Sequence, residues 1–332
     1  MGELSRLIAL LSASQLDDVT EFVMRLLDHS SPTEISIGIV CPECGSVHCV
    51  RNGRVRERQR YMCKDCGRSF GTSNKTSLFC SKLPAGIWRK YIPCLINGCS
   101  VRKAAEIVGV SVKTSFYMRH RILDAIRALM DRNRVGDVVE MDETFFAESF
   151  KGNHSRSSFK LPRPARKRGR QVKKRGLSRE QICVGTAIDR SNNVIMGILC
   201  RGRVTTASLK GLYTRRIAEE TTICTDSAAA YQQFATAVNA ALKAVPTGKH
   251  KVEGYNLGRV NSLHSSLKTW MRRFYGVATK HLANYLAWFT WLAMNRDTSH
   301  NSLPQRMMND MMSQKVDARI KIIRQREVKF AA

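Results

Sequence analysis

The run Val138-Val-Glu-Met-Asp-Glu-Thr-Phe-Phe146 decides the fold of this 332-residue chain. Its valine, methionine, threonine and phenylalanine residues predict a strand, yet an acid, Asp142, interrupts it. Asp226 stands in a similar position, because it ends the short apolar run at residues 221–225. We therefore interpret both acids as candidate members of a functional site.

The elements around this run predict an α/β domain. Strands are expected at residues 138–146, 181–189 and 193–200, and they are followed by alternating helices and strands. Three hairpin strands, then alternating helix and strand, is the order of a ribonuclease H-like fold. The later elements are expected as a helix at 208–220, a strand at 221–225, a helix at 228–243, a short strand near 249–252, and helices at 260–274 and 279–295.

The predicted helix at 260–274 carries a third set of polar residues. Asn261, His264 and Lys268 recur at intervals of three and four residues, which puts them on one face. An acid in a strand, a second acid at a strand end and an oxygen ligand on a helix can together hold two divalent metal ions against a phosphodiester. This layout predicts an enzyme that cuts and joins DNA.

The net charge of +28 and the pI near 10.1 also indicate a polyanionic partner. Nucleic acid is the first candidate. Twelve Lys or Arg and no acid occupy residues 151–179, which we interpret as a mobile basic loop that binds phosphates. Its candidate DNA-binding side chains are Lys167, Arg168, Arg170, Lys173 and Lys174.

Four of the eleven cysteines have the spacing of a metal site. Cys41-Pro-Glu-Cys44-Gly and Cys63-Lys-Asp-Cys66-Gly are near copies, and each should form a tight knuckle. Four thiolates fill a tetrahedral zinc site, so we expect one structural Zn²⁺ in a zinc ribbon. Free thiols would instead leave this polar stretch without a core to fold around.

Residues 100–121 have the texture of a helix-turn-helix. Ala105 is expected at the helix contact, Gly109 at the turn and Ser111 as the cap of the second helix. That second helix would enter the major groove of DNA, although an ordinary helical hairpin is the alternative. Its candidate DNA-binding side chains are Lys113, Thr114, Arg119 and Arg121.

Residues 41–300 resemble an insertion-sequence transposase of the DDE superfamily, in the subgroup with an N-terminal zinc ribbon and an Asp-Asp-Asn-Lys signature. The matching stretches are Arg60-Tyr-Met-Cys-Lys-Asp-Cys-Gly-Arg-Ser-Phe70, Met141-Asp-Glu-Thr144, Thr225-Asp-Ser227, Val260-Asn-Ser-Leu-His-Ser-Ser-Leu-Lys268 and Arg272-Arg-Phe-Tyr-Gly-Val-Ala-Thr-Lys280. The combination of motifs is specific, whereas no single one of them would be.

This resemblance implies that Asp142, Asp226 and Asn261 form a catalytic triad that holds two Mg²⁺ or Mn²⁺ ions, and that Lys268 contacts the DNA of the element's ends. The common third residue of the superfamily is Glu, so Asn261 removes one negative charge, but its carbonyl oxygen remains a ligand. His264 is expected either to carry a proton beside this site or to contact a DNA phosphate. Glu140 and Glu143 flank Asp142, and we expect both to face away from it with structural roles.

The resemblance also implies a mechanism of two-metal phosphoryl transfer, in which cleavage of the element's ends precedes strand transfer into target DNA. Two alternatives belong to other classes of protein. One is a catalytically inactive DNA-binding regulator, which the neutral Asn261 favours, and the other is a metal-dependent nuclease without strand transfer. The expected partners are double-stranded DNA, as terminal inverted repeats and target, and further copies of the chain in a dimer or higher oligomer.

The expected division of the chain follows these motifs. No apolar run approaches the length of a membrane span, and the first residues lack the features of a signal peptide, so a cytoplasmic, nucleoid-associated protein is expected. The predicted parts are an N-terminal helical segment at 1–38, the zinc ribbon at 39–72, the helix-turn-helix-like domain at 80–133, the catalytic domain at 134–300 and a basic C-terminal tail at 301–332.

Overall fold

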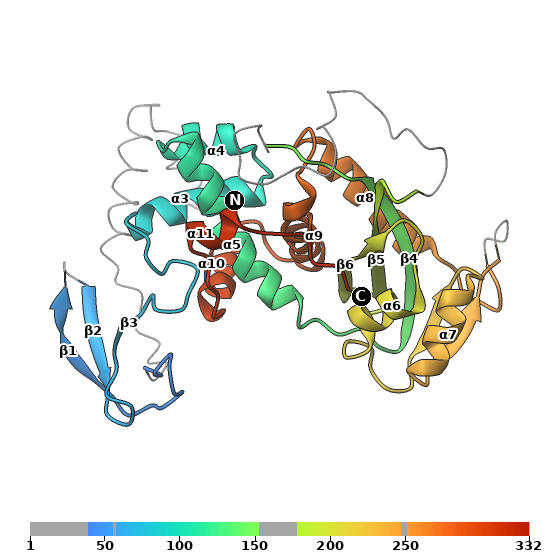
Figure 1. Cartoon of the computed structure of the whole chain (residues 1–332), viewed down its shortest axis with the longest axis horizontal. Helices are drawn as coiled ribbons and strands as arrows, with labels where there is room; N and C mark the ends of the chain where they lie inside the picture. Colours follow the sequence, from blue (N-terminus) through green and yellow to red (C-terminus); the bar gives the residue numbers. More distant parts are fainter. Residues whose placement is uncertain (1–38, 56–57, 153–177, 247–250, 332) are drawn as a thin grey trace, which may run out of the picture. The chain divides into compact units, whose positions relative to one another are not determined.

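The computed structural model describes residues 39–55, 58–152, 178–246 and 251–331 (Figure 1). The expected helical segment at 1–38 and the basic side chains at 167–174 lie outside these residues. The chain divides into two compact units, Met1–Thr72 and Ser73–Ala332, and each is described separately.

The described part of the smaller unit is a three-stranded antiparallel sheet with two cysteine knuckles. Its strands β1 (Cys49–Val55), β2 (Arg58–Cys63) and β3 (Ser69–Gly71) pair in that order. Its buried core consists of Cys41, Cys63 and Phe70. Three side chains bury little apolar surface, so the hydrophobic effect alone stabilises this unit only weakly.

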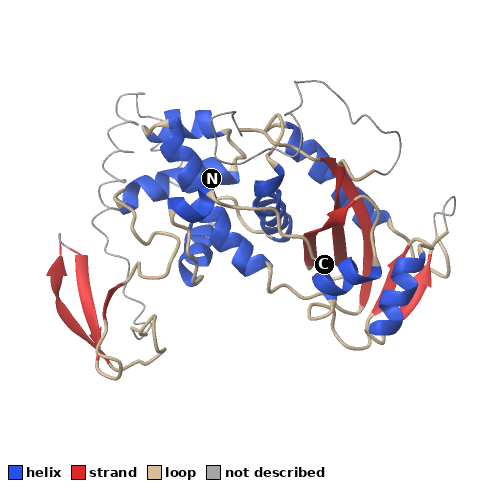
Figure 2. Ribbon diagram, in the orientation of Figure 1, coloured by secondary structure: helices blue, strands red, loops and turns tan. Residues whose placement is uncertain are grey.

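A five-stranded mixed sheet organises the larger unit, with the order β6-β5-β4-β7-β8 (Figure 2). The antiparallel strands are β4 (Val138–Ala147), β5 (Gln181–Asp189) and β6 (Val194–Arg201). Strands β7 (Thr222–Thr225) and β8 (Ala241–Ala244) run parallel to β4. The three hairpin strands expected at 138–146, 181–189 and 193–200 are thus present as β4, β5 and β6.

Both faces of the sheet are covered, because alternate residues of the same strand enter different cores. On one face, Ile182 and Val184 of β5 lie in a core with α8 (Gly258–Arg272) and α9 (Thr279–Met294), and α5 (Val112–Met130) packs against α9. On the other face, Val139 and Met141 of β4 pack with α6 (Thr206–Tyr213) and α7 (Ala229–Ala237). Figure 1 shows the sheet between α9 and α7.

Two of the predicted helices are too long. The helix expected at 208–220 ends at Tyr213, and Ile217 instead forms a bridge with Val135. The helix expected at 228–243 ends at Ala237, and residues Ala241–Ala244 form β8 instead. Asn239 has a left-handed backbone with φ of 53°, which stops the helix. The Ala-Leu-Lys-Ala sequence favours a helix intrinsically, but parallel pairing with β7 overrides that weak preference.

The helical segment before the sheet contains α3 (Ala85–Ile96), α4 (Val101–Val108) and α5. As expected, Gly109 is left-handed in the turn after α4, with φ of 72°, and the Ser111 side chain accepts a hydrogen bond from the Thr114 amide. The rest of α5 is buried against α9 and the neighbouring helices, and α9 packs on β6, so this segment and the sheet share one hydrophobic core within the unit Ser73–Ala332.

The residues expected to form a basic tail are folded onto the same core. They include α10 (Leu303–Ser313) and α11 (Ile320–Arg324), and the Ala331 amide donates to the Leu199 carbonyl of β6. The Arg326 guanidinium donates to both carboxylate oxygens of Asp124 in α5 at 2.6 and 2.7 Å, with both side chains less than a tenth exposed. This buried pair attaches the last residues to the helical core.

Replacing Asp124 with alanine should therefore destabilise the larger unit strongly. Arg326 would keep a buried charge without its partner, and breaking such a pair costs about 3–5 kcal/mol of unfolding free energy. Urea denaturation of the purified protein measures this loss. Asp317→Ala, which breaks the exposed pair with Arg319, is the control and should change stability little. Equal effects of the two substitutions would contradict a special role for the buried pair.

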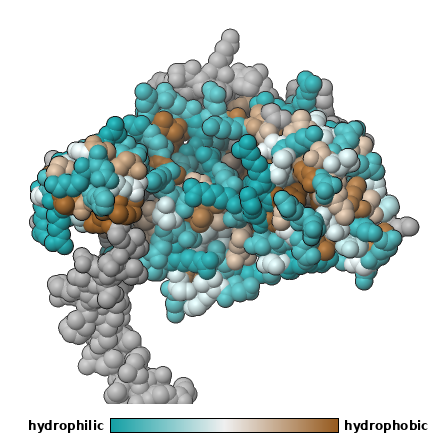
Figure 3. Space-filling model, turned by 90° about the horizontal axis from the view of Figure 1, so that it is seen from below, coloured by the Kyte–Doolittle hydropathy of each residue, from teal (hydrophilic) through white to brown (hydrophobic). Residues whose placement is uncertain are grey.

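The face of the molecule in Figure 3 is mostly hydrophilic, with hydrophobic residues in separate small patches. Within the part of the chain that the structure describes, no helix combines the length and apolar character that crossing a bilayer requires.

Candidate metal and DNA-binding sites

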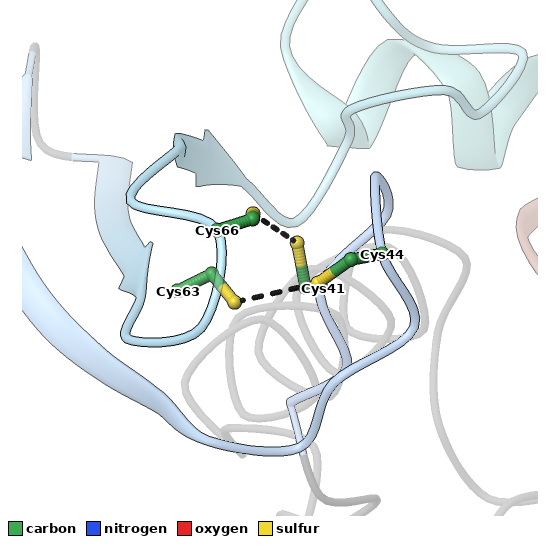
Figure 4. Close-up of side chains that lie close together, drawn as sticks. All are labelled: Cys41, Cys44, Cys63 and Cys66. Atoms are coloured by element: carbon green, nitrogen blue, oxygen red, sulfur yellow. Dashed lines mark hydrogen bonds between the residues drawn. The ribbon is translucent and has the colours of Figure 1, made fainter.

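The four predicted zinc ligands converge in the smaller unit (Figure 4). The Sγ atoms of Cys41 and Cys66 are 3.6 Å apart, as are those of Cys44 and Cys63. A tetrahedral site with Zn–S bonds of about 2.3 Å separates its sulfurs by about 3.8 Å, so these distances fit zinc. All four sulfurs lie within 4.8 Å of one another.

The backbone of each knuckle supports a thiolate. Gly45 and Gly67 have φ of 79° and 67°, and their amides donate to the carbonyls of Cys41 and Cys63 at 3.0 Å. The amide of Cys66, together with that of Asp65, lowers the pKa of the Cys63 thiol to about 6. Each knuckle therefore takes the predicted tight turn. His48 pairs with Asp65 at 3.3 Å and is not in the cluster of four sulfurs.

The two predicted catalytic acids lie side by side at the centre of the larger sheet. Strand β4 pairs with β7 in parallel, with Glu140 opposite Cys224. Continuing this register by two residues brings Asp142 level with Asp226, which directly follows β7. Neighbouring strands are about 4.8 Å apart, so the two carboxylates share one site. Burial, with a contribution from Asp226, raises the pKa of Asp142 above its usual range.

Helix α8 brings the third predicted element to this site. The His264 Nδ1 atom lies 3.6 Å from the Asp142 carboxylate, which is longer than a hydrogen bond. Asn261 is exposed one turn earlier on α8, and Lys268 is exposed one turn later. The charge of Lys268 lowers the pKa of His264, and it opposes in part the rise in the pKa of Asp142 that burial causes.

His264 itself is buried, with 6% of its surface exposed. Burial, and then the charge of Lys268, lowers its pKa to about 4. The imidazole therefore lies beside Asp142 and away from the exposed side of α8.

The neighbouring acids are arranged differently from each other. Glu143 faces α7, and burial, then Asp142 and Asp226, raises the pKa of Glu143 to about 8. Glu140 faces α8, on the same side of the strand as Asp142, so the prediction that it faces away is wrong. Residues two apart on a strand share a face, and that alternation was the signal for Glu140.

The two acids Asp142 and Asp226 make this site suited to a cation. The charges of both also raise the pKa of Glu143, but Glu143 faces α7 and not α8. The cysteine cluster is the only group of three or more His, Cys, Asp and Glu ligand atoms found within the described ranges. Asn261 lies on the helix that brings His264 to Asp142 and carries an amide oxygen, a neutral group that Mg²⁺ accepts as a ligand.

Two of the predicted DNA-binding side chains are buried, and this corrects the sequence interpretation. Arg119 is 1% exposed, donates to the Cys99 carbonyl and stacks 5.2 Å from the Trp288 ring. Arg121 is 6% exposed and donates to the carbonyls of Ser77 and Phe79. Lys113 is exposed and Thr114 half-buried, so only the first turns of α5 present predicted residues to solvent.

Residues 134–293, a little under half of the chain, match the family model of the ISXO2-like transposase domain. This range includes the strands and helices that carry Asp142, Asp226, Asn261 and Lys268. A relative from Halobacterium salinarum, named as an uncharacterized protein in transposable element ISH50, is 26% identical over 256 residues. That alignment covers 76% of this chain and 84% of the relative.

Solved structures were also matched, and the two described next have TM-scores too low to establish a shared fold. The intasome of simian T-cell lymphotropic virus in complex with PP2A regulatory subunit B56 gamma gives 12% identity, 60% and 67% coverage of the two chains and a TM-score of 0.29. The pre-cleavage Mos1 transpososome gives 13% identity, 65% and 75% coverage and a TM-score of 0.21. The domain match and the ISH50 relative together support an insertion-sequence transposase, a class of protein that acts in DNA recombination.

Proposed function

We propose that this protein is a DNA transposase that cleaves the ends of an insertion sequence and joins the freed 3′-hydroxyl strands to target DNA. The observation that carries this proposal is the parallel register of β4 and β7, which brings Asp142 level with Asp226 just after β7, with His264 of α8 beside Asp142. Both acids fall inside the residues that match a transposase domain. The Asp-Asp-Asn-Lys assignment, a ribonuclease H-like fold and Mg²⁺ dependence are parts of the same proposal.

In this proposal Asp142 and Asp226 hold the divalent ions, and Asn261 supplies a neutral third ligand. When bound, such ions activate a water or a 3′-hydroxyl as nucleophile and stabilise the leaving 3′-oxygen. His264, buried beside Asp142, is proposed to carry a proton there or to donate to that carboxylate once DNA and metal are bound. No covalent protein–DNA intermediate is needed, so the chain requires no Ser or Tyr nucleophile.

The experiment that tests the proposal uses duplexes that carry the inverted repeats flanking this gene. Purified protein with Mg²⁺ should nick these duplexes at the element's ends and should join pre-cut 3′-hydroxyl ends to a plasmid. Cleavage without joining would favour the nuclease alternative. Binding without either reaction would favour a regulator, the reading that the neutral Asn261 supports.

DNA is proposed to lie along the exposed side of α8. Asn261, Lys268 and Arg272 are exposed and recur at helical spacing, so they form one stripe that starts at the acidic site. The basic residues at 167–174 and Lys113 are proposed to add phosphate contacts elsewhere. Action on paired DNA ends would require a dimer or higher oligomer. We propose that the protein acts in the cytoplasm, associated with the nucleoid.

The stripe predicts a measurable salt effect. Replacing both Lys268 and Arg272 with alanine should make the plot of log DNA-binding constant against log salt concentration less steep by about 2. Each lost phosphate contact reduces the magnitude of this negative slope by about 0.9. Fluorescence anisotropy of labelled duplex across a salt series measures it. The control is Lys210→Ala, an exposed lysine of α6 on the opposite face of the sheet, which should leave the slope unchanged. An equal change of the salt slope in the double variant and in Lys210→Ala would contradict the placement of DNA along α8.

A further inference from the structure

Glu140 makes an unusual connection between β4 and α8. It is 1% exposed, and its Oε2 atom accepts hydrogen bonds from the amides of Arg259 at 2.8 Å and Val260 at 3.1 Å. Its other oxygen lies 3.6 Å from the Arg190 guanidinium. A buried carboxylate is costly to desolvate, so these donors are what make Glu140 tolerable inside the protein.

The two amides belong to the first turn of α8, where backbone N–H groups have no partner within the helix. The N-cap residue is Leu257, whose side chain has no group to accept them. Glu140 therefore caps α8 from a different element, and its negative charge lies at the positive end of the helix dipole. The Arg259 side chain strengthens the connection, because it donates to the Asp189 carbonyl at the end of β5.

Both partners in this cap, Glu140 and the first turn of α8, lie next to residues of the proposed metal site. Asn261 directly follows the two amides that Glu140 holds. Asp142 lies two residues beyond Glu140 on the same face of β4, about 6.8 Å along the strand. A displacement of α8 by one residue is about 1.5 Å, which would remove an amide oxygen from a ligand distance of about 2.1 Å.

We propose that Glu140 is a positioning residue, which fixes the first turn of α8 so that the Asn261 oxygen meets the same metal ion as the Asp142 carboxylate. The inference rests on the proposed function and deepens it. A neutral amide attracts a divalent ion less than the carboxylate it replaces. Its contribution to metal binding therefore depends on being held in place before the ion arrives.

The test compares two conservative substitutions that separate reach from charge. Glu140→Gln keeps the length and an acceptor oxygen but loses the charge, whereas Glu140→Asp keeps the charge but shortens the reach. The matched controls are made at Glu148, which follows β4 and is 9% exposed. Its carboxylate lies 2.8 Å from the Arg201 guanidinium, away from α8. Circular dichroism and thermal melting check that each variant is folded.

Two measurements report the result. Amide hydrogen exchange at Arg259 and Val260 should accelerate in Glu140→Asp but stay slow in Glu140→Gln. Mn²⁺ affinity, measured by calorimetry, should weaken about 10-fold in Glu140→Asp, as for the loss of other groups that orient metal ligands, and less in Glu140→Gln. Glu148→Asp should change neither quantity.

Wild-type Mn²⁺ affinity in a folded Glu140→Asp protein would overturn the inference, as would equal weakening by Glu148→Asp. These outcomes leave the proposed function intact, because they concern α8 and not the acids. If instead the Asp142→Asn variant binds Mn²⁺ as tightly as the wild-type protein does, the proposed function fails. The exchange rates at Arg259 and Val260 would then still report whether Glu140 caps the helix.

Discussion

Asp142→Asn should abolish Mg²⁺-dependent cleavage of the element's ends while the protein remains folded and bound to DNA. The substitution keeps the volume of the side chain but removes the charge that the two acids direct at a metal ion. Losing several kcal/mol of transition-state stabilisation lowers the rate by about 10³-fold or more. A radiolabelled duplex cleavage assay under single-turnover conditions measures this rate.

The matched control is Asp297→Asn, which removes an equal charge from an exposed side chain, 87% accessible, in the turn after α9. It should cleave at the wild-type rate. DNA affinity should be similar in both variants, because neither side chain is a cation that contacts phosphate. Residual cleavage by Asp142→Asn within about tenfold of wild type would rule out a metal-ligand role, since tenfold is only about 1.4 kcal/mol.

Removal of zinc should unfold the smaller unit and leave the larger one folded. The core of its described part is formed by Cys41, Cys63 and Phe70, and two of these three residues are the proposed metal ligands. Structural zinc contributes about 10–16 kcal/mol of apparent binding free energy in zinc-finger peptides, which is far more than such a core supplies. Cys63→Ser should therefore lose bound zinc and the chemical-shift dispersion of residues 49–71.

Cys49→Ser is the control for this experiment. The Cys49 sulfur lies beside the knuckles and donates to the Ser46 carbonyl at 3.5 Å, outside the cluster of four. This variant should keep one zinc per chain by elemental analysis. A protein that contains no zinc when purified without chelators, yet retains a folded ribbon, would contradict the assignment.

Much of the sheet was predictable from sequence, because strand periodicity is strong where both faces are buried. The prediction at 181–189 matches β5 at both ends, since its apolar run is continuous and polar residues flank it. The segment 241–244 was not predictable, because four residues of high helix propensity become a strand only by pairing with β7. That information is tertiary and not local.

The acids of the candidate site were found for a similar reason. An aspartate within or directly after an apolar strand is conspicuous, and Asp142 and Asp226 each stood out alone. Their proximity depends on the parallel pairing of β4 with β7, which single-sequence patterns do not specify. The role of Glu140 was missed because its partners are backbone amides of α8, and backbone groups leave no mark in the residue types.

The interpretation of α5 shows the opposite error. Basic residues on a helix near a turn suggested DNA contacts, but Arg119 and Arg121 satisfy carbonyl oxygens inside the protein. Their neighbours Met118, Ile122 and Leu123 are fully or nearly fully buried. A helix surrounded by apolar neighbours is buried on most sides. That pattern was the available signal against exposed arginines.

The most direct test of the account is the anomalous scattering of manganese in crystals of the protein bound to its cleaved DNA end. We expect two manganese ions with Asp142 as a shared ligand, one of them also bound by a carboxylate oxygen of Asp226 and the other by the Asn261 amide oxygen, at about 2.1 Å. Manganese bound elsewhere, or bound at the two acids with Asn261 turned away from it, would contradict the claim that these three side chains form one metal site.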